Sequence, residues 1–398
     1  PFNTVTGLKG QFKFTGSGVW LRQSLVVAQF AVSILLIICT ILLQQQMSYI
    51  QQKKLGYQKE KVLVLPADRL VNKKYEVLKG DLLRQANVQS VSRSYETPVK
   101  IDGGYSISVA SKEVDNRPVT AIPISEDFLE TLNMQLLTGQ PLNKTDMAIA
   151  SRVWEDSTAE MPVLINEALA QSLGWTAQSA VGQFVEFRGA RNPIKGVVAD
   201  FHFSSLHEVI KPLVLFPEDY GRVILVRLGN QQLDQTFADL ETIWGKIVMH
   251  RPFSYHFMDE EFDQMYTTEI RTTSVVTTFA WLAIFLACLG LFGLASYNFV
   301  QRTKEIGVRK VLGASTLGIV GLLSKDFLKL VLVALLLAAP VAWYFMTNWL
   351  KNFNYRIDIA WWVIPLAGIV AVLIAFLTVS VQGVRAALAN PIESLRSE

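Results

Sequence analysis

The sequence predicts an α-helical transmembrane bundle of four spans, joined to an α+β extracytoplasmic domain with two lobes. Composition gives the first reason. Hydrophobic residues make up 51% of the 398 residues and charged ones 18%, whereas a soluble chain carries about 25% charged residues. The second reason is that the apolar residues gather in four long runs. The third is that residues 46–272, between the first two runs, hold 24 Lys and Arg and 29 Asp and Glu. A soluble cytosolic enzyme and a disordered scaffold are thereby disfavoured.

Four charge-free segments are long enough to be membrane spans, since a hydrocarbon core about 30 Å thick takes about 20 apolar residues. They are residues 25–45, 273–300, 330–350 and 361–384. Small residues recur in them and favour close helix packing, namely Ala367, Ala371 and Ala375 in the fourth span and Gly290 and Gly293 in the second. None of the four holds an acid, a base or a histidine, which counts against an ion-coupled transporter.

The positive charges of the short loops predict the orientation of the spans. Eleven Lys and Arg lie in the N-terminal arm 1–24, the loop 301–329 and the tail 385–398, and two lie in the short loop 351–360. We therefore expect both termini and the loop 301–329 to be cytoplasmic. Residues 46–272 and the loop 351–360 would then lie outside.

The outer domain is expected to contain two strand–helix–strand units. The first has strands at 62–65 and 88–95 around a helix at 73–85. The second has strands at 222–228 and 253–257 around a helix at 232–247. These units predict a first lobe at 55–125 and 217–258. Between the two units, an inserted lobe is predicted at 126–216, and its first element is a helix predicted at 128–136. A stalk is predicted at 259–272.

No residue of this domain is nominated as catalytic, cofactor-binding or metal-ligating. His202 and His207 are five residues apart, a spacing that does not align them on one helix face, and no His-Glu-x-x-His pattern forms. The acidic run 259–263 is most simply a solvated first helical turn. No Gly-x-Ser-x-Gly motif or nucleophilic cysteine is found. These absences disfavour a membrane-anchored enzyme.

The most informative stretch is the coupling segment, residues 302–315. Glu305 and Arg309 stand at i and i+4 in the favourable order for a helix, and apolar residues leave part of its surface hydrophobic. The simpler interpretation is that the segment is a basic loop that lies on anionic lipid. The functional interpretation is a docking segment, and its candidate residues are Arg302, Lys304, Glu305, Ile306, Gly307, Arg309, Lys310, Leu312, Gly313, Ala314 and Ser315.

At this segment the sequence resembles the FtsX-like and MacB-like permeases of ABC transporters. The run Arg-Thr-Lys-Glu-Ile-Gly-Val-Arg-Lys-Val-Leu-Gly-Ala-Ser at 302–315 is similar to the signature of that family. The ending Asn-Pro-Ile-Glu-Ser-Leu-Arg at 390–396 resembles its usual C-terminus. Residues 163–170 and 196–201 are similar to segments of the MacB-type outer domain. The order of one span, an outer domain and three spans also agrees.

The resemblance implies a permease in the bacterial inner membrane with a periplasmic domain. The coupling segment would dock on a cytoplasmic ABC ATPase, and ATP-driven movement would pass to the outer domain by mechanotransmission, for export, efflux or lipoprotein release. The chain has no Gly-x-x-x-x-Gly-Lys-Ser/Thr motif, so a separate chain would bind ATP and Mg²⁺. No enzyme activity, resident cofactor or nucleic-acid partner is expected.

Further partners also follow from the resemblance. The arm 1–24 is similar to the link before the second half of eight-span permeases. This chain would then be the C-terminal half, and a missing N-terminal half would be its second permease unit; otherwise the chain would homodimerise. A periplasmic adaptor is another candidate partner, and the cargo is not readable. The alternative function is a membrane-anchored receptor or sensor with an extracytoplasmic ligand-binding domain, although the longest cytoplasmic piece, 301–329, is short for an output domain.

Overall fold

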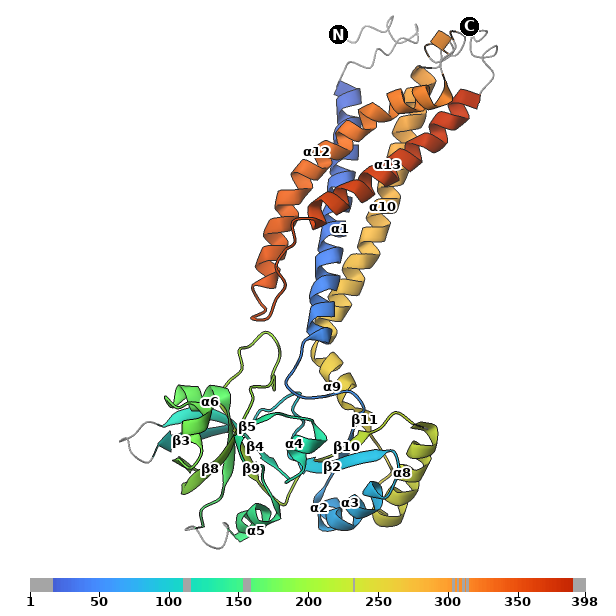
Figure 1. Cartoon of the computed structure of the whole chain (residues 1–398). Coiled ribbons are helices and arrows are strands. Elements are labelled where there is room, and N and C mark those ends of the chain that lie inside the picture. Colours follow the sequence, from blue (N-terminus) through green and yellow to red (C-terminus); the bar gives the residue numbers. More distant parts are fainter. Residues whose placement is uncertain are drawn as a thin grey trace, which may run out of the picture. The chain divides into compact units, whose positions relative to one another are not determined.

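The computed structural model describes residues 17–109, 116–152, 159–231, 233–302, 305, 308, 309, 312 and 315–388. They form two compact units. The helical unit holds the described residues of 1–51, 268–352 and 356–398, and the α/β unit holds those of 52–267 together with Phe353–Tyr355. Figure 1 shows the long helices of the first and the mixed strands and helices of the second.

Four long helices make up the helical unit, and each has a segment apolar and long enough to cross a membrane. They are α1 (Ser17–Gln52), α10 (Thr267–Gln301), α12 (Thr316–Leu350) and α13 (Val363–Leu388). Their candidate spans are Trp20–Gln52, Thr267–Gln301, Ser324–Leu350 and Val363–Gln382. Each overlaps one predicted segment. The helices run beyond the predicted ends because polar residues continue the helical hydrogen bonding: α1, with 36 residues, is roughly 54 Å long at 1.5 Å per residue.

Small residues line the contact between α12 and α13. Ala334, Ala338 and Ala342 of α12 are buried, as are the predicted Ala367, Ala371 and Ala375 of α13, and all six belong to one apolar cluster. A Cβ at Gly368 would lie 2.7 Å from Leu335 Cδ2. Of the two glycines of the second span, Gly290 faces the Gln29 side chain, whereas nothing lies within 4 Å of a Cβ at Gly293. The alanines, and not Gly293, mark the close packing.

The first part of the α/β unit, here called the sheet lobe, is an antiparallel sheet covered by helices. Its strands stand in the order β11 (His256–Phe257), β1 (Val62–Pro66), β10 (Val223–Leu228) and β2 (Val88–Ser94). An apolar cluster joins this sheet to its helices, which include α2 (Arg69–Lys73), α3 (Tyr75–Leu83) and α8 (Leu233–Ile247). The α9 helix (Met258–Met265) follows β11.

The sheet continues from β2 into β4, and this second part, here called the ring lobe, closes on itself. Its strand pairs run β4–β3–β7–β8–β6–β9 and return from β9 to β4, and β5 is added beside β8. Closure removes the exposed strand edges. The strands are β3 (Gly104–Val109), β4 (Arg117–Ile124), β5 (Leu136–Gly139), β6 (Val163–Asn166), β7 (Phe184–Phe187), β8 (Ala190–Val198) and β9 (Leu213–Pro217). Its helices are α5 (Lys144–Arg152), α6 (Glu167–Ser172) and α7 (Ala177–Ala180), whereas α4 (Phe128–Thr131) packs on β2 and β10 of the sheet lobe.

The core of the ring lobe begins earlier in the chain than the predicted insert. Ile107, Val119 and Ala121 belong to its apolar cluster, although the boundary predicted at residue 126 assigns them to the first lobe. The reason is that β3 and β4 pair with strands far ahead in the sequence, and this pairing leaves no local pattern.

Three predicted elements differ from the structure. The helix predicted at 73–85 is divided into α2 and α3 at Lys74, since the Asp68 carboxylate caps an earlier start by accepting from Leu70 N and Val71 N. The helix predicted at 128–136 ends at Thr131, where the left-handed conformation of Asn133 (φ 51°) stops it. The strand predicted at 253–257 is reduced to His256–Phe257, because only these residues pair with β1.

Candidate functional site

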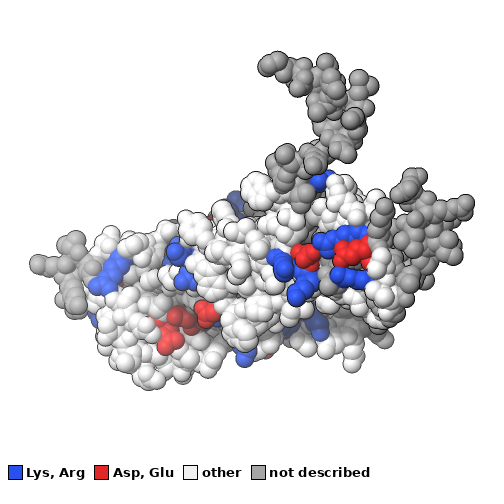
Figure 2. All heavy atoms as spheres, turned by 90° about the horizontal axis from the view of Figure 1, so that it is seen from above, with Lys and Arg blue, Asp and Glu red and all other residues white. Residues whose placement is uncertain are grey.

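The predicted coupling segment lies at one end of the helical unit. The start of α1, the end of α10, the start of α12 and the end of α13 meet at this end (Figure 1). Figure 2 views the structure from that side, where basic side chains lie beside acidic ones. The segment connects α10 to α12 along the chain.

Five of the eleven candidate residues are among those that the structure describes: Arg302, Glu305, Arg309, Leu312 and Ser315. Lys304, Ile306, Gly307, Lys310, Gly313 and Ala314 lie outside the described residues, as does the 390–396 motif. Glu305, Val308 and Arg309 are helical, and the Leu312 N–H donates to Val308 O at 3.0 Å. The predicted Glu305–Arg309 pair is present, with Arg309 Nη2 2.7 Å from Glu305 Oε1.

Ion pairs and a cap fix the two ends of the segment. The Arg302 N–H continues α10 by donating to Asn298 O, and Arg302 Nη2 lies 3.5 Å from Asp326 Oδ2 on α12. At the other end, the Ser315 hydroxyl accepts from Gly318 N and caps α12. The sequence reasoning missed Asp326. Its signal was available, because Asp326 is the only acid between Glu305 and Asp358, in a stretch that is otherwise basic or apolar.

The segment presents charge and apolar surface together. Val308 is 51% exposed and Leu312 80% exposed, and both members of the Glu305–Arg309 pair are about half exposed. Exposed pairs of this kind contribute about 0–1 kcal/mol to stability. The pair therefore contributes little to stability, and Val308 and Leu312 leave apolar surface exposed beside it.

The structure adds a second feature that the sequence reasoning missed, here called the clasp: residues 353–355 of the connection between α12 and α13. They pack as part of the α/β unit. The Tyr355 N–H donates to Leu206 O at 3.2 Å, and the Asn354 side chain donates to His207 O. The Phe353 ring is buried and stacks on His207 with 4.0 Å between centroids. No local pattern marks these residues, because their partners are some 150 positions away.

His202 and His207 both contact aromatic side chains of the clasp. His207 stacks on Phe353, and the His202 ring meets the Tyr355 ring edge-on at 4.5 Å. Burial, with a smaller contribution from Lys53, lowers the pKa of His202 to about 4. His202 is therefore neutral at ordinary pH. Among the described residues no group of three or more His, Cys, Asp or Glu is placed to hold a metal ion.

Comparisons with known proteins match the region that contains the coupling segment. Residues 277–391 match the family described as FtsX-like permease C-terminal. No curated protein matches the chain. This matched region runs from within α10 to beyond α13.

Three solved structures show likeness over about half of the chain. The periplasmic region of MacB from Actinobacillus actinomycetemcomitans has a TM-score of 0.37 at 13% identity and covers 53% of this chain and 94% of its own. The extracellular domain of the transporter YknZ from Gram-positive bacteria has a TM-score of 0.33 at 13% identity and covers 49% of this chain and 97% of its own. A domain of a permease protein from Porphyromonas gingivalis has a TM-score of 0.32 at 14% identity and covers 48% of this chain and 85% of its own. At these TM-scores the likenesses support no conclusion about function.

The resemblance seen in the 302–315 motif is thus confirmed by a match that extends over the last three long helices. Residues 277–391 are similar to the C-terminal region of FtsX-like permeases.

Proposed function

We propose that this chain is the permease subunit of an ABC transporter of the MacB/FtsX type, and that it couples ATP hydrolysis by a separate ATPase chain to movements of the α/β unit. The observation that carries the proposal is the FtsX-like permease match at residues 277–391, which contains the coupling segment. The work done would be export, efflux or extraction of a substrate, with lipoprotein release as one form.

The coupling segment is the proposed docking surface for the ATPase. The Glu305–Arg309 pair holds a helical turn whose Val308 and Leu312 side chains are exposed. An apolar contact ringed by charge is the usual composition of a protein interface. The Arg302–Asp326 pair joins the base of the segment to α12, so that docking forces act on both helices. ATP and Mg²⁺ would be bound by the partner, and the chain itself would have no enzyme activity.

The proposed setting is the bacterial inner membrane, with the termini and the coupling segment in the cytoplasm and the α/β unit in the periplasm. The bias of Lys and Arg in the short loops supports this orientation. A second permease unit would complete the transporter, and a periplasmic adaptor is a further proposed partner.

Of the four chain connections between the helical unit and the α/β unit, two are proposed to carry motion from the helices. The first is α10, which follows α9 directly with Tyr266 between them. The second is the pair Lys351–Asn352, which joins α12 to the clasp. Buried Phe353 and the backbone bond from Tyr355 to Leu206 fix the clasp within the α/β unit. A two-residue connection leaves little slack, so displacement of the end of α12 would pull on the clasp.

The test is co-purification of the full chain with the ABC ATPase encoded beside it, followed by ATP turnover with and without the permease. We expect a stable complex with altered turnover. Replacing Glu305→Ala and Arg309→Ala together should abolish this effect while membrane insertion stays normal, because the docking turn would lose its ion pair.

The matched control is the double variant Asp81→Ala and Arg84→Ala, which removes another exposed ion pair on a helix. It should leave both complex and turnover unchanged. Normal coupling in the Glu305/Arg309 variant would assign the segment to lipid contact. Absence of any complex, even when both permease units are present, would favour the alternative of a receptor or sensor.

A further inference from the structure

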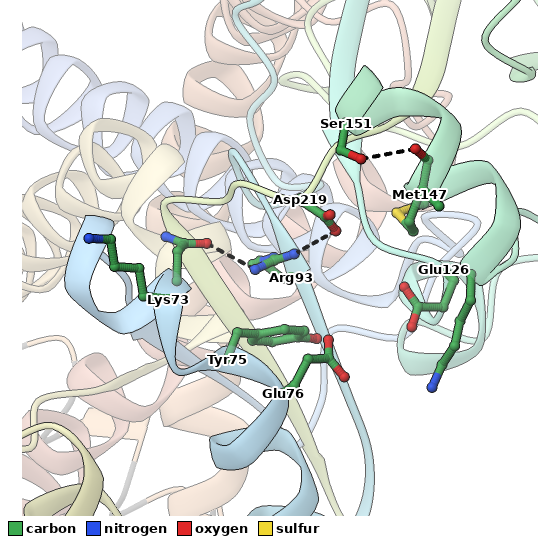
Figure 3. Close-up of a pocket in the computed structure, with 11 residues that line it drawn as sticks. Lys73, Tyr75, Glu76, Arg93, Glu126, Met147, Ser151 and Asp219 are labelled. Carbon is green, nitrogen blue, oxygen red and sulfur yellow. Dashed lines mark hydrogen bonds and ion pairs between the residues drawn. The ribbon is translucent and has the colours of Figure 1, made fainter. Parts of the chain in front are cut away.

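An open cavity of about 450 Å³ lies in the α/β unit, between the sheet lobe and the ring lobe. Helices α2 and α3 form one side of it and α5 forms the other (Figure 3). Its size is within the range of about 300–1,000 Å³ that is typical of sites for small ligands. This cavity belongs to neither the coupling segment nor the clasp, and nothing in the proposed coupling function uses it.

The central cation of the cavity is Arg93 of β2, which is buried with 5% of its surface exposed. Its Nη1 donates to Asn72 Oδ1 at 3.2 Å and its Nη2 to Asp219 Oδ1 at 3.3 Å. Its Nε has no hydrogen-bond partner among the described residues. Charge-assisted bonds of a guanidinium normally measure about 2.7–2.9 Å. The buried Arg93 is therefore only weakly paired.

The residues around Arg93 fix its position but do not fill all of its hydrogen-bonding capacity. The Tyr75 ring lies 4.1 Å from the guanidinium carbon, a cation–π contact that orients its plane. The Asn72 amide is fixed by donating to Asp68 O and Gly221 O and by accepting from Gly221 N. Gly221 has no side chain where a Cβ would lie 2.4 Å from Arg93 Cγ. These contacts form a cradle that holds the guanidinium in one orientation, so less conformational entropy is lost when a ligand binds.

The competing carboxylate is loosely held. The Asp219 side chain is 59% exposed and follows β9 rather than lying within it. Water competes strongly for a carboxylate so exposed. In Figure 3 Asp219 and Tyr75 lie on opposite sides of Arg93, and Met147 of α5 lies across the cavity. A ligand anion could therefore take the place of Asp219 without rearrangement of the core.

The charges around the cavity select among anions. Lys73 and Lys144 add two cations to Arg93, while Glu76, Glu126 and Asp219 supply three acids. A phosphate dianion would be repelled by three nearby carboxylates. A lipid chain would find few apolar contacts, Met147 being the largest aliphatic side chain in the lining. A single planar carboxylate matches the fork of one guanidinium. It brings half the charge of a phosphate dianion, so the three acids, of which Glu126 is already paired with Lys79, oppose it less.

We propose that this cavity is a binding site for ligands that present one carboxylate, and that Arg93 is the residue that binds it in competition with Asp219. The carboxylate can belong to a small free acid or to the C-terminus of a peptide. The site is independent of ATPase coupling, so it can be tested without any ATPase.

The experiment measures binding to the full chain in detergent by ligand-observed NMR. The probes are N-acetyl-trialanine, its C-terminal amide, and acetate. We expect N-acetyl-trialanine to bind and its amide to bind at least about tenfold more weakly, because the amide cannot form charge-assisted bonds with Arg93. Equal binding of acetate and the peptide assigns the site to small acids, whereas preference for the peptide assigns it to chain termini; both results support the carboxylate site.

Two variants move the affinity in opposite directions. Arg93→Lys keeps the charge but loses the fork and should weaken binding about tenfold. Asp219→Asn removes the competitor and should tighten binding about two- to fivefold. Since Asp219 is exposed, its variant folds even if the Arg93 variant does not. The matched control Arg84→Gln removes an exposed cation of the sheet lobe that does not line the cavity and should bind as the unmodified chain does.

Three outcomes would overturn the proposal: equal binding of the acid and the amide, no binding of either at about 10 mM, or weaker binding by the Asp219→Asn chain. The last would show that Asp219 contributes to the site as an acceptor and does not compete for Arg93.

Discussion

Helices α12 and α13 pack through alanines, whereas the ring lobe packs through large side chains. Ala338 and Ala371 are both 3% exposed at the helix contact. In the ring lobe the Phe187, Phe216 and Tyr105 rings lie 5.3–5.9 Å apart. This difference in side-chain size reflects the interaction that drives packing in each part. In lipid, burial of large apolar groups yields little, and helices gain by close approach of their backbones; in water, removal of apolar area drives the packing.

Truncation of a ring-lobe aromatic should therefore give the largest effect. Phe216 is fully buried, so we expect Phe216→Ala to destabilise the α/β unit by about 3–5 kcal/mol through lost burial and a cavity. Proteolysis in increasing denaturant would measure this. Phe279→Ala, at an exposed position of α10, is the control and should have little effect. A shift no larger than that of the control would mean that the rings do not form the core.

Enlargement of a small residue should be the damaging change in the helical unit. Ala338→Leu should cost about 1–3 kcal/mol by forcing α12 away from α13. The control is Leu336→Ala, at a position 75% exposed two residues away, which should change little. Thermal unfolding in detergent would measure both. If the leucine variant were the more stable, close approach would not be what holds these helices.

Acidification should lower the stability of the α/β unit through His202. The direction of this change follows because His202 is neutral in the folded chain. Burial lowers the pKa of His202 from 6.5 to about 4, so between these values the unfolded chain binds more protons than the folded one. Stability is then present above pH 6.5 and is lost as pH falls toward 4. The melting temperature of the α/β unit should fall over this window less in His202→Gln than in the unmodified chain. Equal pH slopes would show that His202 binds a proton as readily in the folded chain as in the unfolded one.

Removal of the exposed pair in the coupling segment should have the smallest effect on stability. The Glu305→Ala and Arg309→Ala variant should change the stability of the helical unit by at most about 0.5 kcal/mol, because both side chains are about half exposed. Thermal unfolding beside the ATP turnover assay would separate the two roles. A large loss of stability would make the pair a structural element and remove it as evidence for docking.

The helical unit was predictable from the sequence because its signals are local. A charge-free run such as 330–350 must be buried in lipid or protein, and the spacing of Ala367, Ala371 and Ala375 follows from the helical period alone. The Glu305–Arg309 ion pair was predictable for the same reason, since i and i+4 always meet on a helix. Asp326 was not nominated, because its partner Arg302 belongs to a different helix.

The α/β unit was predictable only in part. Buried strands such as Val62–Pro66 carry continuous apolar runs, and Asn166, a residue type favoured at helix starts, caps α6. The closure of the ring was not predictable, because β3 and β4 pair with strands distant in the sequence. The side chains around Arg93 come from five separate stretches of chain, and no spacing rule relates them.

The sequence by itself determined the four long apolar helices, the small-residue contact of α13 and the Glu305–Arg309 ion pair, because each depends on neighbours within one or two helical turns. Only the tertiary structure decided the ring lobe, the clasp at Phe353–Tyr355 and the cradle of Arg93. These depend on contacts between residues far apart in the chain, and the free energy that selects them is that of the whole packed unit.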